Sequence, residues 1–587
     1  MTYQIQTGIR NLYYQNRKPF KGVIIFLFIA LYFAYFGYAM YYSFGDEPSW
    51  RLLGFTVFAM LFISGRELMQ YNEHRLEETW KLSIRPCLDS ANCKKSRRIS
   101  SVLLKIVVAG AIAAFVVIDV IIDHPQNLIS FAGLAIYVVL FYISSVNPSK
   151  IRWHPVFWGI SLQFIFAILI LRTRAGYDVF MWCGDRVTEF LNYSTAGSIF
   201  VFGPGYAEHN FAFKVLPIVT FFYSIISLLY YLGVMQFIVR NIGRFLAFCM
   251  GTAPGESLNA AGNILVGMVL TSLIMLFFPK TEAPLMIQPL LADMTVSELH
   301  AVCTGGFSTI AGTVLGAYIN FGAPASHLLS ASFMSAPAAL AISKLSYPEL
   351  ELSTSSTKDY YKMGKAKERN VFEAVSVGAT NSIKIIGAIA VNVMAFLSIL
   401  QFVDATLMWF GERVGYGNIT FEFICSYLFY PFAFFMGVET GDCRSVAGLV
   451  GIKTFVNEFA AYEKLGKLID NNKNFTMYTQ SLNFTDWYKD GDDIILPMVN
   501  QTLTSGILQT KSVVISTYAL CGFSNFGAIG IMLGGIGALA PSRKTDLSRI
   551  MLRAMIAGNA ACLMTGCISG NKEYVLKMTM KFFHRYF

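Results

Sequence analysis

Two carboxylates stand in segments of this chain that are otherwise almost free of charge. Glu282 belongs to Thr281-Glu-Ala-Pro284, and Glu458 belongs to Lys453-Thr-Phe-Val-Asn-Glu-Phe459. A carboxylate in apolar surroundings is costly unless a cation, a hydrogen-bond donor or a proton offsets its charge. Such groups therefore bind polar ligands and ions, or carry protons. We treat Glu282 and Glu458 as candidate binding groups.

Neutral polar residues follow each carboxylate in the same order. Gly305-Gly-Phe-Ser-Thr-Ile-Ala-Gly312 stands downstream of the first, and Cys521-Gly-Phe-Ser-Asn-Phe-Gly527 downstream of the second. Taken singly, an intramembrane Asn or Thr is equally explained by a hydrogen bond between helices, worth about 1 kcal/mol. Together, the two Gly-Phe-Ser copies indicate an internal repeat. Broken, Gly- or Pro-interrupted segments in two halves are typical of the binding site of a transporter.

The composition indicates what must position these groups. Of the 587 residues, 55% are hydrophobic and only 14% charged, against about 25% charged in soluble proteins. This excludes a disordered chain, a coiled coil and a string of soluble domains. The net charge of +10 comes from short segments between apolar runs and does not imply a nucleic-acid partner. The seven His form no catalytic or metal-binding pattern, which argues against a membrane-embedded hydrolase.

Thirteen apolar runs predict a polytopic membrane protein. A helix needs about 20 apolar residues to cross the hydrocarbon core. Basic residues precede the first run, which is typical of a signal anchor, and basic loops elsewhere predict the cytoplasmic side. The runs are Gly22–Ser43, 52–64, 102–122, 130–146, 155–172, 215–239, 258–279, 305–321, 328–343, 380–403, 419–437, 511–540 and 550–568.

The polar stretch 463–510 carries three N-glycosylation sequons, which begin at Asn474, Asn483 and Asn500. Three such triplets in one loop favour an extracellular location.

Several longer motifs resemble the concentrative nucleoside transporter family, sodium-coupled symporters of animals and bacteria. The resemblance runs from about 130 to 570. The matching segments are Phe211-Ala-Phe-Lys-Val-Leu-Pro217, Leu229-Tyr-Tyr-Leu-Gly-Val-Met-Gln236, Asn263-Ile-Leu-Val-Gly267, Thr281-Glu-Ala-Pro-Leu285 through Ala292-Asp-Met-Thr295, Ser308–Tyr318, Gly451–Tyr462, Ala519–Asn525 and Gly530–Pro541.

The resemblance implies an all-α polytopic membrane protein that forms a homotrimer. Each protomer would have a scaffold and a transport domain, the latter built as inverted repeats with two re-entrant hairpins and two unwound helices. Hairpin one would hold Asn263 to Glu282, hairpin two Lys453 to Tyr462, and the partner helices would be 300–321 and 511–535. Three extra spans would precede this unit.

The predicted organisation has seven parts. They are a cytoplasmic N-terminus (1–20), the extra N-terminal spans (21–125), scaffold spans with an interfacial region (126–250), the first transport-domain repeat (251–345), further scaffold spans (346–440), the second repeat (441–570) and a C-terminal tail (571–587).

Site residues follow from the resemblance alone. The sodium site would use the Asn263 side chain, the Val266 carbonyl, the Thr309 hydroxyl and the Ile310 carbonyl. The nucleobase would meet Gly267, Met268, Thr281, Glu282 and Val314. Glu458 and Asn525 would hold the ribose hydroxyls, with Phe523 adjacent.

Three positions depart from the family pattern. Met268 replaces a common Gln, which should alter base preference, and Ala528 replaces a common Ser, which removes one ribose contact. Residues 269–280 intervene before Thr281 and, as a helix, would carry Thr281 and Glu282 roughly 18 Å from Val266. This insert is either a retained intron or alternative splice in the gene model, or the mark of a divergent paralogue.

The function expected from the resemblance is Na⁺-coupled import of nucleosides across the plasma membrane. No bond is made or broken, so we expect no enzyme activity and no cofactor beyond Na⁺ as coupling ion. The alternatives are coupling to H⁺ through Glu282 or Glu458, and a receptor-like membrane protein that binds nucleosides without transporting them. The sequence fixes neither purine against pyrimidine preference nor the sodium stoichiometry.

Overall fold

The computed structural model describes most of the chain between Arg17 and Gly570. The described residues are 17–46, 49–50, 52–54, 56–57, 60, 91–117, 125–208, 213, 216–272, 288–310, 312–351, 368–417, 419–481 and 484–570. Contacts divide the chain into two units, Met1–Val107 and Val108–Phe587.

The first unit contains α2 (Arg17–Tyr42), which includes most of the first predicted span. The Tyr32 hydroxyl lies 2.7 Å from that of Thr56. Helix α5 (Ala91–Phe115) contains the boundary between the units. The predicted run 52–64 lies largely outside the described residues.

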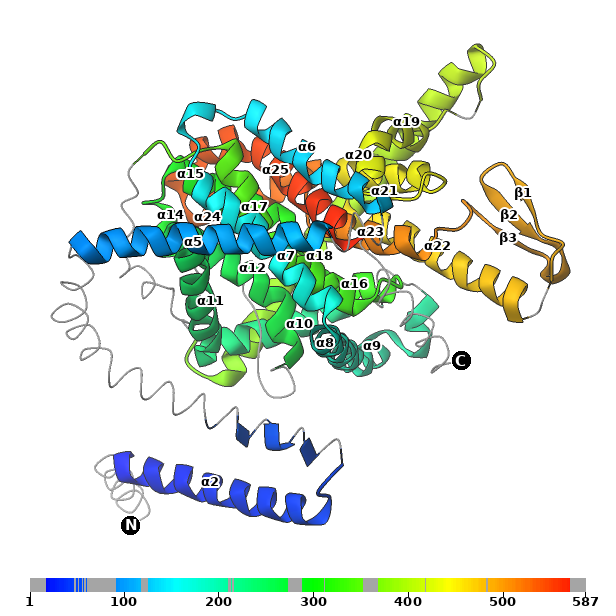
Figure 1. The fold of residues 1–587 in the computed structure, drawn as a ribbon. Helices are drawn as coiled ribbons and strands as arrows, with labels where there is room; N and C mark the ends of the chain where they lie inside the picture. The colour runs from blue at the N-terminus through cyan, green and yellow to red at the C-terminus, as the bar shows by residue number, and fades with distance from the viewer. Residues whose placement is uncertain are drawn as a thin grey trace. The chain divides into compact units, whose positions relative to one another are not determined.

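The described regular structure of the second unit is helical apart from one small sheet (Figure 1). A side-chain hydrogen bond of 3.1 Å from Ser382 to Thr220 links its longest helix, α18, to α10. Outside the segments treated below, its helices are α6 (Leu128–Ile143), α7 (Trp153–Ala167) with a π-helical turn (Ile168–Arg172), α8 (Arg174–Asn192), α9 (Ser194–Phe202), α10 (Leu216–Leu232), α11 (Val234–Met250), α14 (Gln288–Leu291), α18 (Val371–Arg413), α19 (Phe421–Leu428) and α20 (Tyr430–Phe435).

Helix α17 (Ala325–Ser346) lies at the centre of this unit, with nearly all its residues buried. It packs against α7, α12 (Pro254–Ser272), α15 (Val296–Ser308) and α25 (Lys544–Ser569). Its many Ala and Ser residues let the neighbouring backbones approach closely, as is common between helices in membranes. Helices α12 and α15, which carry or adjoin the predicted sodium-site residues, therefore pack against this central helix.

Three interruptions divide what would otherwise be continuous helices. Helix α15 ends at Ser308 and α16 (Gly312–Asn320) begins after three residues. Helix α23 (Thr510–Leu520) is separated from α24 (Phe526–Leu539) by Cys521–Asn525. Helix α21 (Cys443–Phe455) is followed, after Val456 and Asn457, by α22 (Glu458–Thr476), which packs against it. The first two breaks contain or adjoin the two Gly-Phe-Ser sequences.

The described part of the stretch 463–510, which was predicted as a loop, contains helix and a small sheet. Helix α22 continues to Thr476, and beyond its far end lies an antiparallel sheet with strand order β1-β2-β3 (Figure 1). The strands are β1 (Tyr488–Asp490), β2 (Asp493–Leu496) and β3 (Gln501–Leu503), with Tyr488 opposite Ile495 and Ile494 opposite Leu503. Tyr478, Ile494, Leu496 and Leu503 form its small core.

Among the described residues, four helices are long and apolar enough to cross a membrane, by length and composition. They are Trp153–Arg172, Ala325–Ser346, Val393–Arg413 and Pro541–Ser569. Several of the thirteen predicted runs correspond to shorter helices, because breaks divide them. The run 511–540, for example, contains both α23 and α24.

Candidate functional site

Glu458 joins segments of the second unit that are far apart in the sequence. It is the first helical residue of α22 and only 2% exposed. Its Oε2 accepts a hydrogen bond of 2.6 Å from Nδ2 of Asn525, and its Oε1 one of 3.4 Å from the Tyr318 hydroxyl. A carboxylate has about four acceptor positions, so lone pairs remain for the hydroxyls of a ligand.

Asn525 is held in place by its role at the start of α24. Its Oδ1 accepts the N–H of Ala528 at 2.7 Å, an N-cap that fixes the side chain. Its Nδ2 is thereby directed to Glu458. Asn457 caps α22 in the same way, through a 2.9 Å bond from the N–H of Ala460. Both helices thus begin with an asparagine beside the candidate site.

Aromatic rings enclose the Glu458 side. The ring of Tyr318 stacks on Tyr462 with centroids 4.3 Å apart and lies 5.4 Å from Phe459. The Tyr462 hydroxyl donates to the Thr517 carbonyl at 2.8 Å. Val314, a predicted base contact, lies four residues before Tyr318 on α16 and therefore on the same face of that helix.

The predicted sodium-site residues Asn263 and Thr309 both adjoin Gly305. A Cβ at position 305 would lie 2.9 Å from Nδ2 of Asn263. The Thr309 hydroxyl donates to the Gly305 carbonyl at 2.8 Å, which leaves its lone pairs for a cation. Asn263, Thr309 and Ile310 are at most 7% exposed, and Nδ2 of Asn263 has no hydrogen-bond partner in the described part of the chain. Neutral oxygens of this kind suit a weakly held Na⁺.

The two breaks touch each other at Gly522. A Cβ there would lie 2.7 Å from the Phe307 carbonyl oxygen and 2.8 Å from the carbonyl carbon of Ser308. The φ of Gly522 is +102°, a conformation that other residues rarely adopt. Any side chain at position 522 would clash with the backbone of the first Gly-Phe-Ser copy. The second copy therefore requires glycine at this position.

Hairpin one is only partly described. Helix α12 continues through Val266, Gly267 and Met268 as far as Ser272, so the backbone is helical where the hairpin tip was predicted. The apolar residues that begin the insert extend the helical run. The side chains of these three residues, and Thr281 and Glu282 altogether, lie outside the described residues.

Two residues near the site were missed by the sequence reasoning. Tyr318 lies in α16, far from Glu458 in the chain, and no local signal connects them. Lys453 was noted only as part of a polar cluster, yet it is fully buried, with its ammonium 2.9 Å from the Ala519 carbonyl. A lysine within an apolar run is itself a signal of function or pairing.

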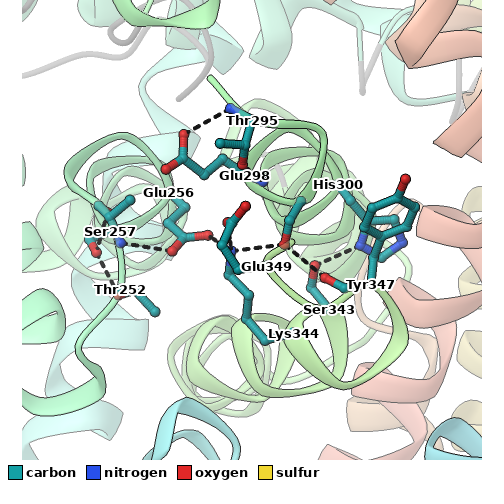
Figure 2. A network of polar contacts seen from close by, with 12 residues as sticks. Thr252, Glu256, Ser257, Thr295, Glu298, His300, Ser343, Lys344, Tyr347 and Glu349 are labelled. Carbon is teal, nitrogen blue, oxygen red and sulfur yellow. Dashed lines mark hydrogen bonds and ion pairs between the residues drawn. The ribbon is translucent and has the colours of Figure 1, made fainter. Parts of the chain in front are cut away.

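A separate network of charged and polar side chains contacts the N-terminal end of α12, as Figure 2 shows. The Lys344 ammonium on α17 lies 2.7 Å from Oε2 of Glu256 and 3.2 Å from Oε2 of Glu349. It also donates to the Ser297 hydroxyl at 3.1 Å. The network borders a cavity of about 290 Å³. Because a buried ion pair is costly to break, it holds the first turn of α12 against the end of α17.

Family models match three consecutive parts of the chain. The Na⁺ dependent nucleoside transporter N-terminus matches residues 132–205, a nucleoside recognition model called Gate matches 212–325, and the Na⁺ dependent nucleoside transporter C-terminus matches 327–570.

Curated relatives share this similarity over most of their length. The chain is 42% identical over 567 residues to solute carrier family 28 member 3 of Eptatretus stoutii, covering 96% of this chain and 76% of the relative. It is 44% identical over 515 residues to the human protein of that name, covering 88% and 69%. With sodium/nucleoside cotransporter 2 of Rattus norvegicus it shares 39% over 567 residues, covering 96% and 79%.

Solved structures of CNTnw have a similar fold. An inward-facing, substrate-bound state is 29% identical with a TM-score of 0.63, covering 76% of this chain and 97% of that one. A variant in an outward-facing state is also 29% identical, with a TM-score of 0.65 and coverage of 76% and 98%.

Proposed function

Because this chain belongs to the Na⁺-dependent nucleoside transporter family, we propose that it is a Na⁺-coupled symporter that imports nucleosides across the plasma membrane. Its relatives bear the names of sodium/nucleoside cotransporters, and the CNTnw structures include inward- and outward-facing states. Both support alternating access, in which the inward Na⁺ gradient drives the nucleoside uphill. The protein makes and breaks no covalent bond in this process.

The observation that carries the proposal is the convergence on Glu458. Asn525 and Tyr318 approach its two oxygens from different predicted repeats, within 2.6 and 3.4 Å. A carboxylate beside an amide can accept and donate to the two hydroxyls of a ribose, which a bare nucleobase lacks. Phe523, next to this pair along the break, would pack on the sugar.

The sodium ion would bind in the first repeat, to Asn263, Val266, Thr309 and Ile310. The nucleobase would lie against Gly267, Met268 and Val314, with Thr281 and Glu282 completing that side if residues 269–280 allow it. Met268 in place of Gln would weaken polar recognition of the base. Selectivity would then depend more on the ribose side.

The interrupted helices support an elevator-type movement of a transport domain, formed by 251–345 and 441–570, against a scaffold. Hairpins one and two would be re-entrant, their two partner helices would be unwound at the breaks, and the complete transporter would be a homotrimer.

We further propose an extracellular position for the sheet beyond α22. Asn500 lies exposed between β2 and β3, where a glycan could attach, whereas Asn474 lies within α22. Asn483 lies outside the described residues.

The direct test is uptake of labelled uridine and adenosine in cells that lack nucleoside transport. Uptake in Na⁺ medium is compared with uptake in choline medium at two pH values, for the whole chain and for a form lacking residues 269–280. We expect Na⁺-dependent uptake by at least one form. Uptake that persists in choline and rises at low pH would instead assign the coupling to H⁺.

One observation favours a second candidate, a membrane protein that binds nucleosides without transporting them. Helix α12 continues past Gly267 and Met268 into the insert, so the first hairpin differs from the family pattern. This candidate predicts that the whole chain binds labelled nucleoside without uptake, while the shortened form transports.

A further inference from the structure

The second repeat contains a buried charge for which the proposed transport cycle has no stated use. Lys453 on α21 is 0% exposed, although it carries an ammonium group. Its Nζ lies 2.9 Å from the Ala519 carbonyl, 3.3 Å from the Cys521 carbonyl and 3.4 Å from Oδ1 of Asn559. Within the described ranges, no carboxylate forms an ion pair with it.

The partners of Lys453 are the oxygens that a bound cation would use. The carbonyls of Ala519 and Cys521 stand at the C-terminal end of α23, where the last carbonyls lack helical partners and carry partial negative charge. Asn559 on α25 is oriented by donating from Nδ2 to the Thr454 hydroxyl at 2.9 Å, which directs its Oδ1 to the ammonium. The ammonium is thus coordinated from two other segments.

Lys453 also corresponds in sequence to the sodium-site residue Asn263. Each stands three residues before a valine, Val266 and Val456, on the helix that leads into the candidate site. Alignment of the two Gly-Phe-Ser copies pairs Gly305 with Cys521. The structure agrees with this pairing, since Asn263 adjoins Gly305 and Lys453 bonds to the carbonyl of Cys521.

We propose that the Lys453 ammonium is a tethered cation, which supplies beside the second break the positive charge that Na⁺ would supply beside the first. This inference rests on the proposed function for the sodium site. The first repeat would coordinate an exchangeable ion with neutral oxygens. The second repeat supplies its own cation, so this half of the site keeps its broken helix and Glu458 in position whether or not Na⁺ is bound.

The proposal predicts that removing the ammonium creates a cation site. Lys453→Met ends the side chain one atom earlier and removes the charge, and Lys453→Asn installs the amide found at Asn263. Each leaves the Ala519, Cys521 and Asn559 oxygens without the ammonium, with a space of ammonium size in the Met variant and a larger one in the Asn variant. Lys464→Met removes a lysine on α22 that pairs with Glu422 at a partly exposed position, and serves as the matched control.

The experiment measures the thermal unfolding midpoint of the purified full chain against ammonium, sodium and choline chloride at constant ionic strength and pH. We expect ammonium to stabilise the Lys453→Met and Lys453→Asn proteins, while the natural chain and Lys464→Met show no ammonium response. In uptake, we expect both Lys453 variants to need a second monovalent cation, so that ammonium added to Na⁺ medium raises their transport about tenfold.

Equal responses of the natural chain and both Lys453 variants would overturn the inference. Lys453 variants that fail to fold in ammonium as well as in choline would also overturn it, because a free cation would then not replace the missing Lys453 ammonium. These results differ from failure of the proposed function, which would appear as absent Na⁺-dependent uptake by the natural chain and by the form lacking residues 269–280. The unfolding measurement does not depend on transport.

Discussion

The two broken helices differ in what faces their breaks. Beside Thr309 and Ile310, the first has the amide of Asn263 and backbone carbonyls, all neutral. Beside Cys521 and Asn525, the second has the ammonium of Lys453 and the carboxylate of Glu458. On our proposal, the first break takes up its cation from solution, whereas the second already contains both a cation and a carboxylate.

The difference between the two breaks corresponds to two tasks of a symporter, which are exchange of the coupling ion and recognition of the substrate. A coupling ion has to enter and leave in each cycle, which favours neutral ligands and weak binding. A group that recognises ribose hydroxyls has to be ready before the substrate arrives, which favours fixed partners such as Asn525 and Tyr318. The four predictions below test this division, from the largest expected effect to the smallest.

Replacing Glu458 by Gln should abolish the ribose contact of the second repeat. Hydrogen bonds to a charged group contribute about 1.5 to 3 kcal/mol each, so we expect uptake at low substrate concentration to fall about 100-fold. Initial rates of labelled uridine uptake measure this. Glu463→Gln changes an exposed carboxylate on the same helix and should leave uptake unchanged. Normal uptake by Glu458→Gln would remove Glu458 from the site.

The close contact between the two broken helices at Gly522 can be tested by substituting one glycine beside each break. Gly522→Ala forces a Cβ against backbone atoms at 2.7 and 2.8 Å with φ at +102°, and should destabilise the protein by about 3 kcal/mol. At the corresponding Gly306, a Cβ would meet only the flexible end of Met532, so Gly306→Ala should cost much less. Thermal unfolding of both purified variants measures the difference. Equal losses would contradict the asymmetry.

Asn263→Lys should give the first repeat a tethered cation of its own. We expect the Na⁺ dependence of uptake to weaken, with the ratio of uptake in Na⁺ to uptake in choline falling about tenfold. Asn263→Gln keeps an amide and should keep Na⁺ dependence at a higher Na⁺ requirement. An Asn263→Lys protein that folds and still requires Na⁺ would place the ion elsewhere.

The smallest effect is expected for Tyr318→Phe, which removes one 3.4 Å hydrogen bond to Glu458 and keeps the stack on Tyr462. A single hydrogen bond of this kind contributes about 0.5 to 1.5 kcal/mol. We therefore expect KM to rise a few-fold with little change in maximal rate. Tyr488→Phe, on the exposed strand β1, is the control. An unchanged KM would show that Tyr318 does not position the carboxylate.

The sequence was informative where polar residues interrupt apolar runs. Glu458, Asn525 and the two Gly-Phe-Ser copies predicted two broken halves, because such residues are rare and costly at these positions. The partners of those residues could not be predicted, since Tyr318 and Glu458 are joined only by the folded chain. The contact between Asn559 and Lys453 could not be predicted either, because it too forms only in the folded chain.

The sheet beyond α22 was missed because its strands are only three or four residues long. Strands this short carry no clear alternating pattern, and the polar composition of 463–510 suggested a loop. Tyr478 stabilises the sheet by joining Ile494 and Leu503 in a separate small core. That core depends on side chains spread over more than one element, which local periodicity does not reveal.

The most direct test of the account is the membrane current that nucleosides evoke in cells expressing this chain. A neutral nucleoside that enters with Na⁺ carries positive charge inward, so we predict an inward current that disappears when choline replaces Na⁺ and is absent in Glu458→Gln. If the chain is inactive because of residues 269–280, the form lacking them should give this current. A nucleoside-evoked current of equal size in choline, or Na⁺-independent uptake by both forms, would contradict the account.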